Sequence, residues 1–320
     1  MGQSEATAPE RSQVGIADMN LWTRPTFVAA LAAAPLIACS APADAGIGDL
    51  LVAPTRIVLD GRKGAEVVLN NIGEEPAVYR VSVEFRRMDQ DGGLNDVAQP
   101  TADDQKAADM IIYAPRRVTL APHEPQAIRI AARAPQGIPD GEYRVHLLFR
   151  AIPPATPVVQ AAASEPEKGL RFQLTPVYGV TIPVIVRLGN LQATAGIADV
   201  HLEKKARPLG NGHATLPVCS LSSNSITCPE TGQKPVVSLE LSRTGTRSTF
   251  GEVRVFKPGV KDPIALLKAV AIYTEINQRH VDVPVNPAFK GELAGPVTVQ
   301  YVETFDDGSH VLAETQAVLR

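Results

Sequence analysis

The stretch LRFQLTPVYGVTIPVIVRLG, residues 170–189, decides the fold class of this 320-residue chain. At a spacing of two residues it places its large apolar side chains on one face, which is typical of a β-strand. Those side chains are Phe172, Leu174, Pro176, Tyr178, Val180, Ile182, Val184 and Val186. Pro176 and Pro183 have no backbone N–H, and a strand tolerates that loss where no neighbour needs the donor. We therefore predict that the stretch lies, at least in part, at the edge of a sheet.

An open edge strand with a row of apolar side chains is a hazard that proteins usually suppress. Its presence favours a strand that pairs with another protein chain. The alternative is a buried strand of a β-sandwich in which the two prolines are tolerated. The residues alone leave both interpretations open.

Composition favours an all-β protein of two domains. The hydrophobic fraction is 44% and the charged fraction 20%, which is typical of a globular chain. The 31 basic and 34 acidic residues give no excess of positive charge, so we expect no nucleic-acid partner. The 27 prolines and 24 glycines favour many short strands separated by turns. We predict two immunoglobulin-like β-sandwich domains, at 46–189 and 190–320, after an export signal at 1–45.

The N-terminal region has the anatomy of a secretory signal peptide. We expect translation to start at Met19, and the apolar run Phe27–Ala38 is too short to span a bilayer comfortably. Cleavage after Ala45 would release a soluble exported protein, which is our prediction. The sequence Leu36–Cys39 also resembles a lipoprotein box, so a protein tethered to the outer membrane through a lipid on Cys39 stays as the alternative.

Cys219 and Cys228 are the two cysteines beyond this region. In an oxidising compartment we expect them to form a disulfide that closes a short loop and contributes roughly 2.5 to 3 kcal/mol. The six histidines lack the short spacings of a metal site, and no serine or cysteine stands in a nucleophile motif. We predict neither an enzyme nor a bound metal or cofactor, and we interpret His146 as a core or surface histidine.

Short strand candidates recur from Leu50 to Gly189 at the spacing of a sandwich. Turn signals separate them, and Asp89–Gly93 is interpreted as a hairpin tip. They are Leu50–Val58, Glu66–Asn71, Ala77–Arg86, Ile111–Tyr113, Val118–Leu120, Gln126–Ala132 and Gly141–Ile152. With the opening stretch, their number is close to the seven or so strands of an immunoglobulin-like sandwich.

Four motifs in this region stand in a characteristic order. They are Pro54–Gly61, Tyr113–Pro115, Leu120–Pro122 and Gly141–Pro154. Together they resemble the N-terminal domain of periplasmic pilus-assembly chaperones. The resemblance implies that the chain binds a pilus or surface-structure subunit that lacks its last strand, and supplies its own edge strand in place of the missing one. It also implies release to an outer-membrane usher without ATP.

The resemblance assigns subunit-binding roles residue by residue. Arg56 corresponds to the arginine that binds the subunit's terminal carboxylate, and a guanidinium can do so with two parallel hydrogen bonds. The donor side chains correspond to Leu174, Pro176 and Tyr178, extended by Phe172. The family's lysine on this strand is replaced by Pro183, and Arg187 is the nearest alternative cation. Without the motifs, Arg56 would be interpreted as a surface arginine at a strand end.

The second domain shows strand patterns but no motif of the family. The candidates are Gln192–Glu203, Ala214–Leu221, Val236–Arg243, Glu252–Phe256, Ala269–Ile276, His280–Val285, Pro296–Val302 and His310–Val318. Pro263–Val270 could instead form a helical turn, and we interpret the basic loop Ser242–Ser248 as solvated.

The sequence therefore predicts a periplasmic chaperone for pilus or surface-structure subunits. The alternative is a structural or adhesive surface lipoprotein of the same fold whose edge strands join copies of itself.

Overall fold

The computed structural model describes residues 49–153, 177–205, 220–222, 225–227, 233–305 and 308–320. Most of these residues form strands, which confirms the all-β prediction. The described part of the chain holds one helix, α1 (Ala102–Met110), and it contains no helix with the length and apolar character needed to cross a membrane.

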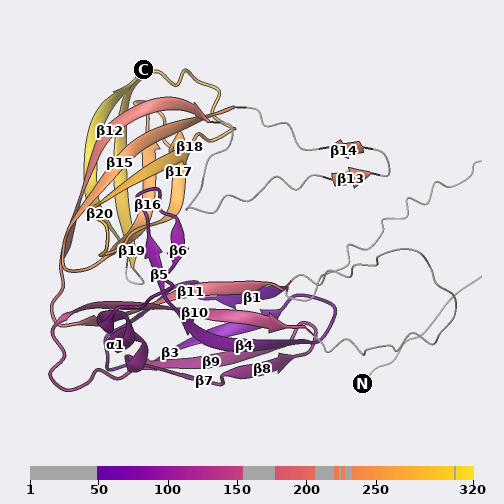
Figure 1. Cartoon of the computed structure of the whole chain (residues 1–320). Helices are drawn as coiled ribbons and strands as arrows, with labels where there is room; N and C mark the ends of the chain where they lie inside the picture. Colours follow the sequence, from indigo (N-terminus) through magenta and orange to yellow (C-terminus); the bar gives the residue numbers. More distant parts are fainter. Residues whose placement is uncertain (1–48, 154–176, 206–219, 223–224, 228–232, 306–307) are drawn as a thin grey trace, which may run out of the picture. The chain divides into compact units, whose positions relative to one another are not determined.

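Two sheets make the first sandwich (Figure 1). The first sheet has the order β1 (Leu50–Ala53), β3 (Ala65–Asn71), β9 (Pro125–Ala132), β7 (Ile111–Ala114). The second has the order β2 (Ile57–Leu59), β11 (Gly179–Leu188), β10 (Gly141–Ile152), β4 (Ala77–Glu84), β8 (Arg117–Leu120).

The first predicted strand is split between these two sheets. β1 pairs antiparallel with β3, whereas β2 pairs parallel with β11. The break falls at residues 54–56, where Pro54 cannot donate a ladder hydrogen bond. The chain therefore crosses from one sheet to the other immediately before Ile57, and Arg56 lies at the crossing.

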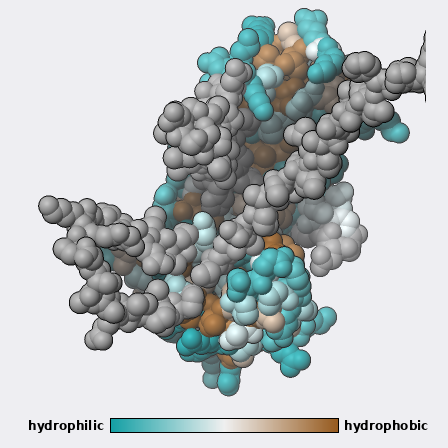
Figure 2. All heavy atoms as spheres, turned by 90° about the vertical axis from the view of Figure 1, so that its right-hand side faces the viewer, coloured by the Kyte–Doolittle hydropathy of each residue, from teal (hydrophilic) through white to brown (hydrophobic). Residues whose placement is uncertain are grey.

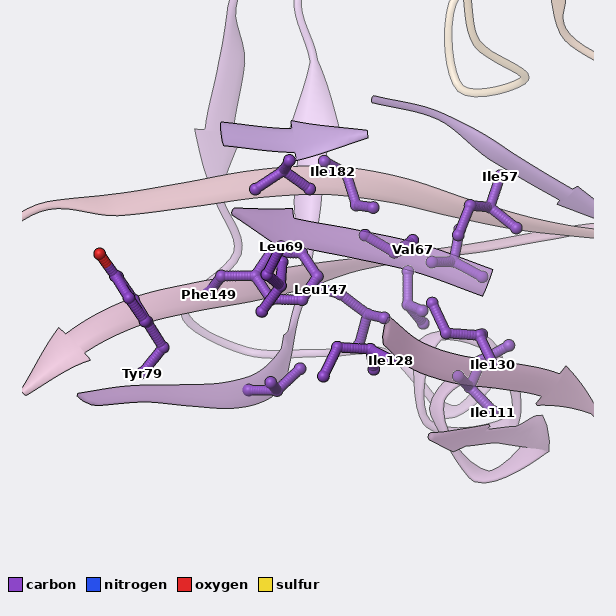
Figure 3. Close-up of a cluster of buried hydrophobic side chains, with 14 of the residues drawn as sticks. Ile57, Val67, Leu69, Tyr79, Ile111, Ile128, Ile130, Leu147, Phe149 and Ile182 are labelled. Carbon is purple, nitrogen blue, oxygen red and sulfur yellow. The ribbon is translucent and has the colours of Figure 1, made fainter. Parts of the chain in front are cut away.

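The core of the first sandwich lies between the two sheets. Figure 3 shows Leu69 and Ile128 from one sheet meeting Leu147 and Phe149 from the other, and all four are fully buried. β3 and β9 alternate buried with more exposed positions, as the period of a strand requires, whereas β10 buries the three consecutive residues Val145–Leu147.

The hairpin tip predicted at Asp89–Gly93 is confirmed, whereas the helix was not predicted. β5 (Arg86–Met88) pairs with β6 (Leu94–Asp96) around the expected turn at Asp89–Gly93. Helix α1 begins with a capping box, in which the Asp104 amide donates to Thr101 Oγ1 and the Asp104 carboxylate accepts from the Thr101 amide. A threonine followed three residues later by an acidic residue was the available signal.

The second sandwich also has two facing sheets. One has the order β12 (Ala193–Lys205), β15 (Lys234–Gly245), β18 (Gln278–Pro284); the other has the order β17 (Ala265–Ile272), β16 (Thr249–Phe256), β19 (Gly295–Phe305), β20 (Gly308–Leu319). A separate pair is formed by β13 (Ser220–Ser222) and β14 (Ser225–Thr227). The helical turn considered for Pro263–Val270 is wrong, because β17 occupies most of that range. Its Ala265, Val270 and Ile272 are buried in the second core.

Several predictions fall outside the described residues. These are the export signal with Cys39, the disulfide of Cys219 with Cys228, and the donor side chains Phe172, Leu174 and Pro176. The boundaries of the two domains stay a prediction, although each core draws its buried residues from one side of Gly189.

Candidate functional site

Strand β11 has a partly open edge. Its neighbour β10 pairs with it along Gly179–Leu188, whereas β2 on the other side pairs with Val184–Val186 alone. Among the described residues, no strand pairs with Gly179–Pro183 on the side of β2. The N-terminal half of β11 is therefore an edge, as the prolines predicted.

The hydrogen-bond pattern shows which backbone groups face the open side. The Ala151 N–H donates to the Tyr178 carbonyl at 3.0 Å, so Tyr178 is bonded towards β10. Bonding alternates along an antiparallel pair, and the odd-numbered residues Gly179, Thr181 and Pro183 therefore direct their backbone groups away from β10. Pro183 contributes a carbonyl but no N–H at this edge, which is the placement that a strand proline requires.

The apolar face of β11 changes its surroundings along the strand. Ile182, Val184 and Val186 are buried in the first core, and Val180 packs against it. Tyr178, in line with them at the period of two, has 55% of its surface exposed. On the face drawn in Figure 2, brown apolar patches stand between teal hydrophilic residues. The donor row predicted upstream of Tyr178 lies outside the described residues.

Arg56 lies beside this edge and carries unused hydrogen-bond donors. The register of β2 places Ile57 opposite Val184, so Arg56 lies one position before the pairing begins. The guanidinium carbon lies over the ring of Phe250, 4.5 Å from its centroid. The Nε and Nη2 atoms of Arg56 are buried and have no hydrogen-bond partner. Burial lowers the pKa of Arg56, and the nearby Tyr273 opposes that shift.

Arg187, the other candidate cation, is already engaged. Its Nε donates to Glu142 Oε2 at 2.9 Å, and its Nη2 donates to the Ser248 carbonyl at 3.0 Å. The Ser248 amide donates to the same Glu142 oxygen at 3.0 Å. Arg187 therefore joins β10 to the segment before β16, which leaves Arg56 as the cation with unpaired donors near the open edge.

The loop Ser242–Ser248 is solvated only in part, which corrects that interpretation: Thr244, Gly245 and Thr246 are exposed, whereas Arg243 and Ser248 are buried. The Arg243 guanidinium donates to several backbone carbonyls, including that of Gly245 at 2.9 Å and that of Arg247 at 3.1 Å. Arg247 forms a two-pronged ion pair with Glu303, at 2.7 and 2.8 Å. These contacts hold the loop in the conformation that presents Ser248 to Arg187.

Residues from both sandwiches close around β11 on the face opposite the first core. Met88, Ile185, Ala271 and Tyr273 form a separate buried cluster, in which Ile185 belongs to β11. The Arg144 side chain lies over Tyr273, 3.7 Å from the ring centroid. Phe250 packs against this cluster, which fixes the ring below Arg56.

The site combines an open strand edge, an unpaired guanidinium and an aromatic ring. Sequence reasoning identified the edge and Arg56 but missed Phe250, which lies almost two hundred positions further along the chain. No local pattern marks Phe250, because its role depends on how the two sandwiches meet. Within the described ranges, no group of three or more histidines, cysteines and acidic residues could hold a metal ion.

Comparison with known proteins gives weak similarities. No protein-family model matches the chain, and no curated protein matches its sequence. A crystal structure of the YadV chaperone aligns with 13% identity and a TM-score of 0.40, covering 85% of this chain and 100% of that one. The E. coli chaperone DraB aligns with 14% identity and a TM-score of 0.41, covering 85% and 96%.

A third structure, the Salmonella enterica SafA pilin in complex with the SafB chaperone, aligns with 15% identity and a TM-score of 0.40, covering 84% and 96%. Similarities at this level carry no argument about function, so the proposals below rest on the geometry of the site.

Proposed function

We propose that this chain is an exported, periplasmic chaperone that holds a pilus or surface-structure subunit by strand donation. The subunit would pair with the open half of β11 and place its C-terminal carboxylate on Arg56. The residues proposed to contact it are Arg56, Tyr178 and Arg187, together with Phe172, Leu174 and Pro176. An outer-membrane usher that receives the subunit belongs to the same proposal.

One observation carries this proposal: two buried, unpaired guanidinium nitrogens lie at the end of an unpaired strand edge. A buried donor without a partner is costly, and it is stabilised when a ligand supplies the missing acceptor. A carboxylate fits, because its two oxygens match the fork of a guanidinium.

The register also sets the direction of the bound strand. β2 runs parallel to β11 and begins at Ile57. A partner strand that occupies the same side of β11 upstream, along Gly179–Pro183, must end where β2 begins. If it also runs parallel to β11, its C-terminus meets Arg56. The open edge therefore favours a partner strand that runs parallel to β11 and ends with its C-terminus beside Arg56.

The expected affinity comes mainly from apolar side chains. Burying three or four of them would contribute roughly 5 to 10 kcal/mol before ordering costs are subtracted. The backbone groups of Gly179 and Thr181 and the Pro183 carbonyl add hydrogen bonds that fix the register.

The test is co-purification from the periplasm. The chain expressed from Met19 with a C-terminal tag is isolated, and stoichiometric partners are identified by mass spectrometry. Arg56→Ala and Tyr178→Asp are compared with Arg129→Ala, a control on an arginine whose side chain is 85% exposed. We expect a distinct β-rich partner with the wild type and the control, and its loss in the two site variants.

Hydrogen exchange on the complex tests the strand pairing itself. The partner should slow exchange at the Thr181 amide, which faces the open side, and leave Val180, which faces β10, unchanged. A partner that survives both site substitutions, or protection elsewhere than on β11, contradicts strand donation. Recovery of copies of this same chain would instead support a self-associating surface protein.

A further inference from the structure

We propose that Phe250 is a positioning residue for Arg56, so that the second sandwich supplies part of the carboxylate site. This inference rests on the proposed function and assigns a role to the second domain within it. Phe250 belongs to β16 and pairs with Ala271 of β17, whereas Arg56 belongs to the first sandwich. The contact between them is the 4.5 Å approach of the guanidinium to the ring.

The ring is held from several directions. Its backbone lies in the ladder between β16 and β17, and its side chain packs against the cluster that contains Met88, Ile185 and Tyr273. A ring fixed by packing on both sandwiches offers a constant surface to the guanidinium. The orientation of Arg56 is therefore set before any partner binds.

An aromatic ring beside an arginine leaves the guanidinium N–H groups without an acceptor, whereas a carboxylate accepts hydrogen bonds from them. The negative face of a ring attracts a guanidinium without accepting its N–H groups as a carboxylate does. Arg187 and Arg247 show the other arrangement, because Glu142 and Glu303 accept hydrogen bonds from their guanidinium groups. Phe250 holds Arg56 in place, and Nε and Nη2 keep their hydrogen-bonding capacity unused.

The Phe250 ring also offsets part of the electrostatic cost of burying the charge of Arg56. Desolvation by burial and the positive charge of Arg187 both lower the pKa of Arg56. Both effects disfavour the charged form of Arg56. A ring face stabilises a cation most strongly when the cation is desolvated. The pair of Arg56 and Phe250 is thus a preorganised receptor for a terminal carboxylate.

The experiment compares two forms of one synthetic peptide. The probe is a nine-residue peptide that alternates valine with threonine or lysine, made with a free C-terminal carboxylate and with a C-terminal amide. Its affinity for the purified chain is measured for the wild type, Phe250→Leu and Phe250→Tyr. The ratio of the two affinities reports the carboxylate contact, and the affinity of the amide form reports strand pairing.

We expect the wild type to prefer the free acid by roughly 10- to 100-fold, the value of a charge-assisted pair of hydrogen bonds. Phe250→Leu, which keeps an apolar side chain but removes the ring, should reduce that preference by about 3- to 30-fold. Phe250→Tyr keeps the aromatic face and should restore the preference. In an Arg56→Ala background, Phe250→Leu should leave the preference unchanged.

Each failure has its own signature. If neither peptide binds the wild type, or both bind equally, the proposed function fails and this inference falls with it. If the wild type prefers the acid and Phe250→Leu keeps the full preference, the positioning role is overturned while the proposed function stands. An equal loss of affinity for both peptides would make Phe250 a packing residue, and that result also overturns the inference.

Discussion

Acid should destabilise this protein partly through one histidine, because His146 is buried in its neutral form. His146 lies on β10 with 1% of its surface exposed, and neither ring nitrogen has a hydrogen-bond partner. Burial is the main cause that lowers the pKa of His146 to about 3, from an ordinary value of 6.5. The positive charges of Arg144, Arg86 and Arg87 lower it further.

The sign follows from proton binding by the two states. Below pH 6.5 the unfolded chain protonates His146, whereas the folded protein does not until the pH approaches about 3. The stabilisation is fully present above pH 6.5 and is lost progressively as the pH falls below it. Each pH unit in this window costs about 1.4 kcal/mol, so the loss at pH 4.5 is about 3 kcal/mol.

Urea denaturation of the wild type and His146→Leu at pH 7.5 and pH 4.5 measures this contribution. Leucine has no proton to bind, and the other titrating groups are common to both proteins. The variant should therefore gain about 3 kcal/mol relative to the wild type when the pH is lowered from 7.5 to 4.5. An unchanged difference between the two proteins at both pH values would refute the reasoning.

Two further predictions concern contacts between the sandwiches. Arg144 donates to both carboxylate oxygens of Glu275, so Glu275→Ala should cost about 3 to 5 kcal/mol by leaving a buried cation unpaired. Adding Arg144→Met should recover much of the loss in a double-mutant cycle, and an additive result would contradict the pairing. Gly92→Ala should destabilise the protein by more than Gly259→Ala. Both glycines have φ near +80°, but an added Cβ at Gly92 would collide with the Arg279 guanidinium, whereas nothing lies within 4 Å at Gly259. Thermal unfolding of the two variants checks the difference, and equal melting temperatures would rule out the collision.

The strands could be predicted because their patterns depend on residues that are neighbours in the sequence. The alternation in Gly141–Ile152 predicted β10 with its full bounds, and Pro183 predicted the open edge of β11. The period of two residues identified β10 as a strand, and the missing N–H of Pro183 identified the edge of β11. The loop Ser242–Ser248 was misinterpreted because its contacts depend on how the chain folds and not on the local sequence. Its charges are typical of a solvated loop, and Glu303, the partner of Arg247, lies far away in the chain.

The candidate site was predictable in part for the same reason. Arg56 was assigned through motifs, but its unpaired donors and its contact with Phe250 depend on packing between two sandwiches. Arg187 was predicted as a cation for the partner, and in the structure its guanidinium donates to Glu142 and Ser248. Contact between Arg187 and a partner protein stays a prediction.

The last rung between β10 and β11 has a consequence for evolution. The hydrogen bond from the Ala151 N–H to the Tyr178 carbonyl brings the two ends of the intervening connection side by side. For a loop whose ends are fixed in this way, each doubling of its length costs only about 0.6 kcal/mol in closure entropy. The rung therefore fixes where this stretch of chain leaves and rejoins the sheet and puts little constraint on its length, so natural selection can lengthen or shorten it upstream of the proposed donor residues Phe172, Leu174 and Pro176.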